Sequence, residues 1–140
     1  MKPKNCLIFG ASGLIGRHLI RKLTQNNFKV TAVTRNIHQK GYILKTQGNP
    51  GYINIVESNI FDENKIRVLL KKADICINLV GILYEKGKVN TFKNIHENFQ
   101  IFCQIFVENI VFNNLFICRR LELKMPKIVC MQKANYKEKF

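Results

Sequence analysis

Three regularly spaced glycines stand near the start of the chain, at Gly10, Gly13 and Gly16 in the stretch IFGASGLIG. They follow a short apolar run and precede a helical pattern. In such a strand, turn and helix, the first glycine permits a tight turn, the second lets the backbone approach a pyrophosphate, and the third lets the helix pack against the strand. Unpaired N–H groups at the helix start then face the anion. The loop therefore predicts a site for the phosphates of a dinucleotide.

The end of the second apolar run predicts which dinucleotide is bound. An acidic residue there would hydrogen-bond the ribose 2′-hydroxyl and repel a 2′-phosphate. This chain has Thr34 and Arg35, with no acid beside them. A guanidinium suits bidentate contact with phosphate, and Arg17, after the third glycine, would supply a second cation. We expect NADP(H) in preference to NAD(H). The alternative is that Arg35 is only a solvated residue of a loop and contacts no ligand.

Alternating strands and helices are predicted to hold these residues in place. Apolar runs typical of buried strands lie at residues 5–9, 28–34, 52–58, 74–81 and 114–118. Strands that alternate with amphipathic helices need crossover connections, so we expect a parallel sheet with helices on both faces. The predicted fold class is α/β, a doubly wound Rossmann-type sheet of about five strands in the order 3-2-1-4-5, incomplete at its C-terminal edge.

Helical spacing of apolar residues predicts three helices between these strands. The first has its apolar face at Ile15, Leu19, Ile20 and Leu23. The second, capped by Asp62, has its apolar side at Ile66, Leu69, Leu70 and Ala73. The third carries Phe92, Ile95, Phe99, Phe102, Phe106 and Ile110. Turn-forming residues predict a loop before the third strand, at Gly41, Gly48, Pro50 and Gly51.

Composition limits the classes of function. A chain of 140 residues with 46% hydrophobic content can bury one core. The net charge of +14 fits an acidic partner, or the Lys, Asn and Ile bias of an AT-rich genome. The lysines are scattered and no helix-turn-helix or stacking motif is visible, so we expect no nucleic acid partner. No apolar stretch approaches the length of a membrane span, which predicts a cytoplasmic protein.

Five cysteines are present, at Cys6, Cys76, Cys103, Cys118 and Cys130. Their number is odd and none forms a CxxC pair. At least three fall within apolar patterns, so we expect buried, reduced thiols and no metal site.

The GxxGxxG spacing resembles the extended and atypical branch of the short-chain dehydrogenase/reductase superfamily, over residues 5 to about 118. Four segments together resemble the nucleotide-binding accessory subunit of respiratory complex I and its bacterial relatives: IFGASGLIGRHL, VTRN, DICINLVG and NTFKNIHENFQIF. The resemblance implies that Asn59 lies near the adenine and Gly81 near the nicotinamide ribose. The family usually has an aspartate where Ser58 and Asn59 stand. The candidate cofactor-binding residues are Gly10, Ser12, Gly13, Leu14, Ile15, Gly16, Arg17, Arg35, Asn59, Ile60, Val80 and Gly81.

The catalytic residues of the superfamily have no counterpart in this chain. Its reductases place a serine after the fifth strand and a Tyr-x-x-x-Lys on the following helix. Here Arg119 and Arg120 follow the fifth run, and Tyr136 is followed four positions later by Phe140. His96 is interpreted as a packed or capping residue. We therefore expect a nucleotide-binding domain at residues 1–118, a basic tail at 119–140, and a truncated chain.

These observations predict an NADP(H)-binding domain with a structural or binding role and no catalysis of its own. The resemblance implies as partner a respiratory complex, or another protein that covers the open sheet edge, with at most peripheral contact at the inner face of a membrane. Three alternatives stay open: a fragment of a sugar-nucleotide epimerase or reductase, a redox-sensing NADP(H)-binding regulator, and a remnant without function.

Overall fold

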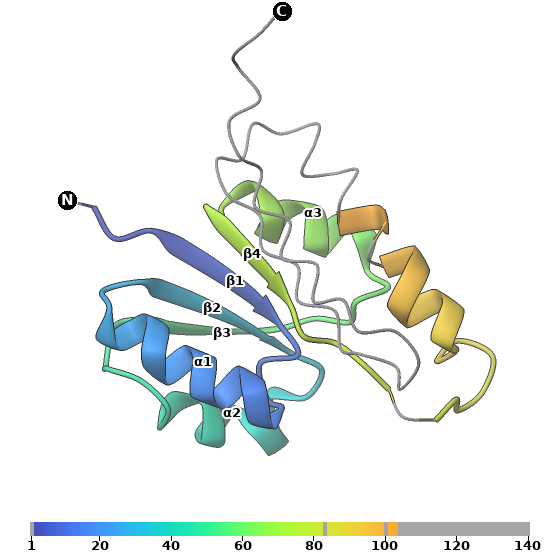
Figure 1. Cartoon of the computed structure of the whole chain (residues 1–140), viewed down its shortest axis with the longest axis horizontal. Coiled ribbons are helices and arrows are strands. Elements are labelled where there is room, and N and C mark those ends of the chain that lie inside the picture. The colour runs from blue at the N-terminus through green and yellow to red at the C-terminus, as the bar shows by residue number, and fades with distance from the viewer. Residues whose placement is uncertain (1, 83, 100, 104–140) are drawn as a thin grey trace, which may run out of the picture.

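A four-stranded parallel sheet forms the centre of the protein, in a computed structural model that describes residues 2–82, 84–99 and 101–103 (Figure 1). The strands are β1 (Asn5–Phe9), β2 (Lys29–Thr34), β3 (Ile53–Glu57) and β4 (Ile75–Asn78). Their order is β3-β2-β1-β4. The α/β class and the order 3-2-1-4 are therefore confirmed. The predicted fifth strand at 114–118 and the tail at 119–140 lie outside the described residues.

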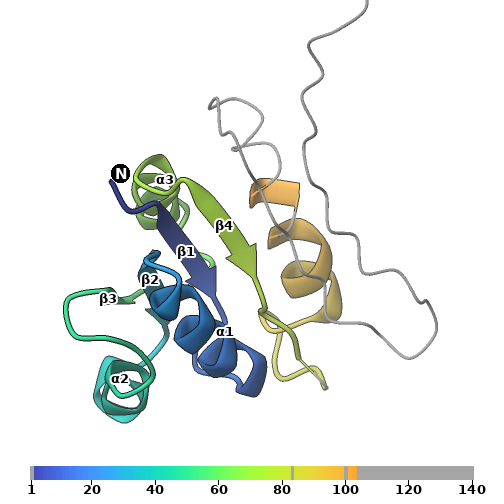
Figure 2. The ribbon, with the colours of Figure 1, turned by 60° about the vertical axis from the view of Figure 1, so that its left-hand side comes forward.

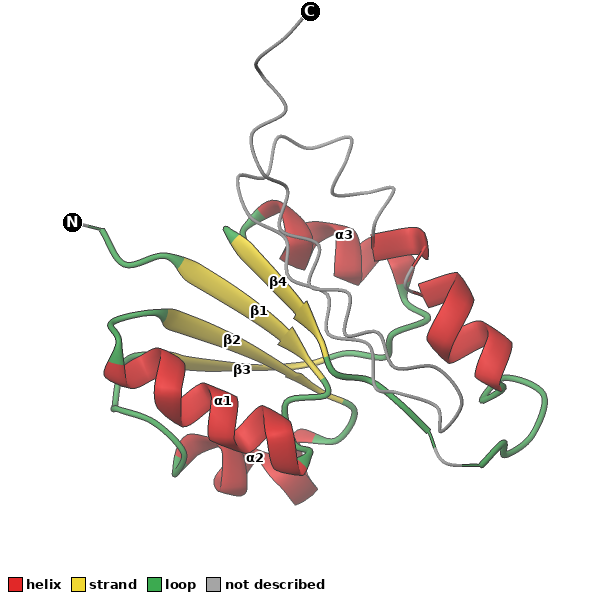
Figure 3. Cartoon of the chain, viewed as in Figure 1, coloured by secondary structure: helices red, strands yellow, loops and turns green. Residues whose placement is uncertain are grey.

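Helices cover both faces of this sheet, as Figure 2 shows. The helices α1 (Leu14–Gln25) and α2 (Ile37–Lys45) pack on one face. On the other face lie α3 (Glu63–Lys71) and a helical segment at 92–99 and 101–103, of which Lys93–Asn98 is π-helical (Figure 3). Among the described residues, no helix has the length and apolar character that crossing a bilayer requires.

The central strand β1 is apolar on both of its sides because both are covered. Cys6 and Ile8 belong to the core under α1 and α2. Leu7 and Phe9 belong to the core under α3, where the Phe9 ring meets Phe99 edge to face at 5.2 Å. This two-sided burial explains why the run reads as continuously apolar in the sequence.

Helix α1 packs on the core through Ile20, Leu19 and Leu23, as its apolar pattern predicts, but not through Ile15. The buried positions are Gly16, Ile20 and Thr24, four residues apart. Ile15, expected on the buried face, is 64% exposed, and this part of the prediction is wrong. At Gly16 the backbone of α1 lies against Ala11 in the turn after β1, and the residue before it, Ile15, is directed into solvent.

Helix α2 corrects the predicted loop that begins at Gly41. The Asn36 side chain caps this helix by accepting the Gln39 N–H at 3.1 Å. Gly41 is buried within it, and Leu44 is fully buried against the sheet. Packing of Leu44 outweighs the low helix propensity of Gly41, roughly 1 kcal/mol relative to alanine. The other predicted turn formers, Gly48, Pro50 and Gly51, do lie between α2 and β3.

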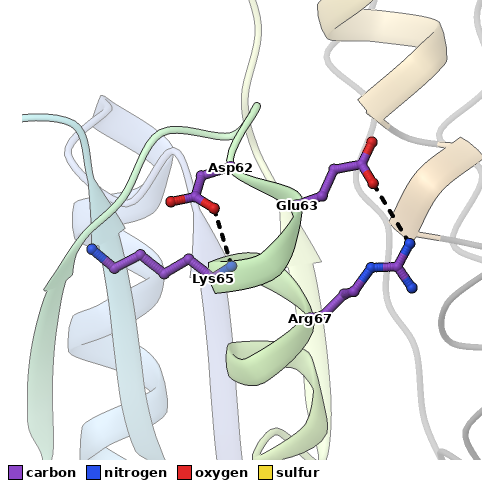
Figure 4. Close-up of polar contacts among 4 residues, drawn as sticks. All are labelled: Asp62, Glu63, Lys65 and Arg67. Carbon is purple, nitrogen blue, oxygen red and sulfur yellow. Dashed lines mark hydrogen bonds and ion pairs between the residues drawn. The ribbon is translucent and has the colours of Figure 1, made fainter.

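Helix α3 begins as predicted, with Asp62 as its cap. The Asp62 carboxylate accepts the Lys65 N–H at 3.2 Å (Figure 4). Glu63, the next residue, forms an exposed ion pair at 3.5 Å with Arg67, one turn further along the helix. The Arg67 guanidinium also lies 5.2 Å from the Phe102 ring centroid. These contacts fix the start of α3 and link this helix to the helical segment at 101–103.

Three of the cysteines are buried and free, as expected: Cys6, Cys76 and Cys103. Burial raises the pKa of Cys6 and Cys103 to about 12 and that of Cys76 well above its usual range. Protonated, inaccessible thiols react slowly with disulfides. In a Cys118→Ser/Cys130→Ser chain at pH 8, we expect an aromatic disulfide reagent to label no thiol in the native state and three in denaturant. Rapid native labelling would contradict this burial.

Candidate nucleotide site

A pocket of about 400 Å³ opens at the carboxyl ends of the four strands. This is the edge at which open parallel sheets bind their ligands, and the volume falls in the range of small-molecule sites. Eight of the twelve predicted residues line it: Gly10, Ser12, Gly13, Arg35, Asn59, Ile60, Val80 and Gly81. The other four, Leu14, Ile15, Gly16 and Arg17, follow directly in α1 and are not among its lining residues.

The glycine turn brings two backbones together at the floor of the pocket. Gly10 has a φ of +74°, and a Cβ there would lie 2.8 Å from the carbonyl carbon of Leu79. By contrast, a Cβ at Gly13 would meet only the Gly10 carbonyl oxygen, at 3.4 Å. Glycine is required at Gly10 by the fold itself. At Gly13 the protein leaves open space, which suits the close approach of a phosphate.

The start of α1 offers backbone donors to this space. Its N-cap is Gly13, which has no side chain to accept them, and its first turn contains no acidic residue. In α2 and α3, Asn36 and Asp62 perform that capping. The first N–H groups of α1, at Leu14 and Ile15, therefore remain for an anion. Their side chains point into solvent, 67% and 64% exposed, so any role of theirs in binding lies in the backbone.

Neither Gly16 nor Arg17 lines the pocket, although both belong to the first turns of α1 beside it. A Cβ at Gly16 would lie 2.5 Å from the Ala11 carbonyl oxygen, so this glycine lets α1 pack on the turn. The Arg17 side chain is half-buried, and its Nε is buried without a hydrogen-bond acceptor among the described residues. Its position, one turn into α1, leaves it outside the pocket lining.

At the end of β2, Thr34 is buried and Arg35 is exposed at the pocket rim. Within residues 2–82, 84–99 and 101–103, the Arg35 side chain forms no hydrogen bond or ion pair. An acid does approach this turn, however, from a distant part of the sequence. The Glu57 carboxylate, at the end of β3, accepts the Ile37 N–H at 3.0 Å. The expectation that no acid stands near Arg35 holds for the sequence but not for the fold.

Asn59 lies on the pocket side of the β3–α3 turn. Its Oδ1 accepts the Phe61 N–H at 3.1 Å, which leaves the amide NH₂ as the group for a ligand. An aspartate at this position would present only acceptors. Buried Ser58, directly before it, donates its N–H to the Thr34 carbonyl oxygen at 3.0 Å. The ends of β2 and β3 are thus tied together beneath the site.

The segment after β4 also lines the pocket. Buried Asn78 accepts the Val80 N–H through its Oδ1 at 3.0 Å and so shapes the turn that carries Gly81. Val89, Asn90 and Ile95 also line the pocket, and sequence reasoning did not assign them to the site. A buried asparagine at a strand end was the available signal for Asn78. For Val89 and Asn90 the sequence carries no comparable signal.

The charge of the lining favours an anionic ligand. Among the described residues that line the pocket, Arg35 is the single charged side chain, and the others are apolar, amide, hydroxyl or glycine. The described residues also hold no group of three or more His, Cys, Asp or Glu suited to a metal. The His96 side chain lies outside the described part.

Curated relatives include two named respiratory subunits. The chain is 32% identical over 78 residues to the mitochondrial NADH dehydrogenase (ubiquinone) 1 alpha subcomplex subunit 9 of Arabidopsis thaliana, covering 56% of this chain and 19% of that protein. It is 27% identical over 89 residues to the 40 kDa subunit of mitochondrial NADH-ubiquinone oxidoreductase of Neurospora crassa, covering 64% and 23%. This agrees with the predicted resemblance.

A third relative is an enzyme by name. The UDP-N-acetyl-alpha-D-glucosaminuronate decarboxylase of Bacillus cytotoxicus is 34% identical over 80 residues, covering 57% of this chain and 24% of that protein. In all three comparisons the chain spans only about a fifth to a quarter of the relative's length.

Solved structures share the fold at low sequence identity. Pen from Bacillus thuringiensis superimposes with a TM-score of 0.69 at 16% identity, covering 83% of this chain and 38% of that one. WbmH of Bordetella bronchiseptica, solved with NAD⁺, has a TM-score of 0.66 at 16% identity, covering 81% and 38%. ElxO, solved with NADP, has a TM-score of 0.65 at 20% identity, covering 84% and 55%.

The match to a family extends further along the chain than any of these relatives. Residues 2–130 match the NmrA-like family. With the parallel sheet, the glycine turn and the pocket at the strand ends, the match identifies an NAD(P)-binding Rossmann domain of the atypical short-chain dehydrogenase/reductase type. The chain belongs to the NmrA-like family.

Proposed function

We propose that this chain binds NADP(H) in preference to NAD(H), and that it acts through this binding and not through catalysis of its own. The observation that carries the preference is Arg35, the single charged side chain among the described lining residues, at the end of β2. Without an ion pair in the described part of the chain, its guanidinium is available to a 2′-phosphate.

The remaining pocket residues suit the rest of a dinucleotide. Gly13 and the start of α1 would receive the pyrophosphate, because the backbone is open there and its donors are uncapped. Asn59 and Ile60 would flank the adenine, and Gly81 the nicotinamide ribose. The nicotinamide supplies hydride exchange when bound. The chain's contribution at these positions is to bind and orient the dinucleotide.

A structural role within a larger assembly is the favoured context for this binding. Two relatives are subunits of NADH:ubiquinone oxidoreductases by name, and a respiratory complex, or another protein that covers the sheet edge, is the proposed partner. The second candidate is part of a sugar-nucleotide enzyme, favoured by the decarboxylase relative. Turnover assays with UDP-sugars separate the two, since sustained turnover by the purified chain would favour the enzyme.

Arg35→Ala tests the preference directly. We expect NADPH affinity to fall about 10- to 100-fold, because a charge-assisted phosphate contact contributes roughly 1.5–3 kcal/mol. NADH affinity should change less than about twofold, since NADH lacks the phosphate that the arginine would contact. Calorimetric titration of both nucleotides measures this.

Arg21→Ala is the matched control for this titration. Arg21 lies on α1, where its guanidinium donates to the Gln47 side chain at 3.1 Å, and it is not among the pocket residues. Its loss should leave both affinities unchanged. Equal affinities for NADPH and NADH in the parent chain, or an Arg35→Ala variant that keeps NADPH affinity, would remove Arg35 from the site.

A further inference from the structure

We propose that Glu57 is a specificity-determining residue, which limits the preference for NADPH by placing a negative charge beside the turn that carries Arg35. This inference rests on the proposed function, because it concerns the same pocket. Glu57 is the last residue of β3 and pairs in register with Thr34, the last residue of β2. The parallel pairing therefore brings Glu57 to the end of β2, where no acid stands in the sequence.

Glu57 holds the start of α2 from outside that helix. Its Oε2 accepts the N–H of Ile37, the first helical residue, at 3.0 Å. The N-cap residue of α2, Asn36, accepts a second N–H of the first turn, that of Gln39, at 3.1 Å. Two donors of the first turn are thus satisfied by two side chains, one of them charged. An ionised acceptor at this position also interacts favourably with the helix start.

Two neighbouring residues at the end of β3, Glu57 and Ser58, hold the two ends of the turn between β2 and α2. Ser58 donates its N–H to the Thr34 carbonyl oxygen at 3.0 Å on one side. Glu57 accepts the Ile37 N–H on the other. Arg35 stands between these two anchors. The backbone that carries the guanidinium is therefore held while its side chain stays at the pocket rim.

The charges around this turn oppose each other in their effect on a 2′-phosphate. Among the described residues, Arg35 and Glu57 do not form an ion pair, so neither charge is neutralised by direct contact with the other. Lys65 adds a positive charge nearby, since its ammonium donates to the Glu57 carbonyl oxygen. A 2′-phosphate bound at Arg35 is attracted by Arg35 and Lys65 and repelled by Glu57, whereas an uncharged 2′-hydroxyl is little affected by any of the three charges.

Glu57→Gln separates the charge from the hydrogen bond, because the amide oxygen can still accept the Ile37 N–H. We expect the dissociation constant for NADPH to fall about three- to tenfold and that for NADH to change less than about twofold. The gain should shrink as salt is raised from about 0.05 to 0.5 M, because the interaction is screened. A purely structural role of Glu57 would show no such salt dependence.

Asp74→Asn is the matched control. The Asp74 carboxylate also accepts a backbone N–H, that of Asn5 at 2.8 Å, but at the amino ends of the strands, opposite the pocket. This variant has the same change in charge and should keep the parent ratio of the two affinities. Glu57→Asp retains the charge and should also keep that ratio. A shift with Glu57→Asp as large as that with Glu57→Gln would overturn the charge-based account.

The outcomes for Arg35 and Glu57 are distinguishable. If Arg35→Ala loses NADPH affinity while Glu57→Gln leaves the ratio unchanged, the proposed function stands and the inference about Glu57 is wrong. If the parent chain shows no preference for NADPH and Arg35→Ala has no effect, the proposed preference is wrong and the inference is overturned with it.

Discussion

Gly13→Val is expected to abolish nucleotide binding, with a loss in affinity of more than about 100-fold, while the protein stays folded. A Cβ at Gly13 would meet only the Gly10 carbonyl oxygen at 3.4 Å, an ordinary contact, and Gly13 has a φ of −71° that any residue adopts. The space that the valine would fill is that of the proposed pyrophosphate. The valine side chain should therefore lower the stability of the fold only slightly but lower the affinity for the nucleotide strongly.

Two measurements on the same samples test this separation. Titration with NADPH gives the affinity, and thermal unfolding gives the stability. Because glycine is a better N-cap residue than valine, the free energy of unfolding should fall, but by no more than about 1 kcal/mol. Gly13→Ala, with a smaller side chain, should lose less affinity than the valine variant. Unaltered NADPH binding by Gly13→Val would mean that the nucleotide binds elsewhere.

Gly16→Ala is expected to have the largest effect on stability. Its Cβ would lie 2.5 Å from the Ala11 carbonyl oxygen and 2.7 Å from the Ala11 carbonyl carbon and Cα, all backbone atoms. Helix α1 must then move away from the turn and from the buried contacts of Ile20. We expect a loss of about 2–4 kcal/mol in the free energy of unfolding, and a Tm lower by about 10–20 °C.

Gly41→Ala is the control for the third glycine, because it makes the same chemical change at another buried helical position. Its Cβ would meet the flexible Cγ1 of Ile37 at 3.1 Å, and alanine favours the helix by roughly 1 kcal/mol. This variant should be neutral or more stable than the parent. If chemical denaturation gives Gly16→Ala and Gly41→Ala the same stability, close packing of α1 is not what requires glycine at Gly16.

Local patterns were sufficient to predict most of the described fold. Strand β1 is recognisable because both of its sides are buried, and α3 because Asp62 precedes an apolar helical pattern. Helix α2 was missed because Gly41 reads as a turn former, while the burial of Leu44 that stabilises the helix depends on tertiary packing. Ile15 was misplaced because apolar spacing indicates which side of a helix is buried, but not which residues of that side reach the core. That depends on how α1 packs on the sheet.

The site was predictable where it is local in sequence and not where it depends on strand pairing. The glycine turn and Arg35 are read from consecutive residues. Glu57 and Ile37 are 20 positions apart, and only the register of β2 against β3 brings them together. The roles of Val89 and Asn90 likewise follow from the path of the chain after β4.

The backbone contact between Gly10 and Leu79 has a consequence for how the pocket receives its ligand. The two segments touch without an intervening side chain, and Leu79 also donates its N–H to the Phe9 carbonyl oxygen at 2.9 Å. The proposed phosphate end and the proposed nicotinamide end of the pocket therefore share one base. The conformational entropy of ordering that base is lost during folding, before any nucleotide arrives. Binding energy is then not consumed in assembling it, and the spacing between the two ends acts as a fixed length against which a dinucleotide is matched.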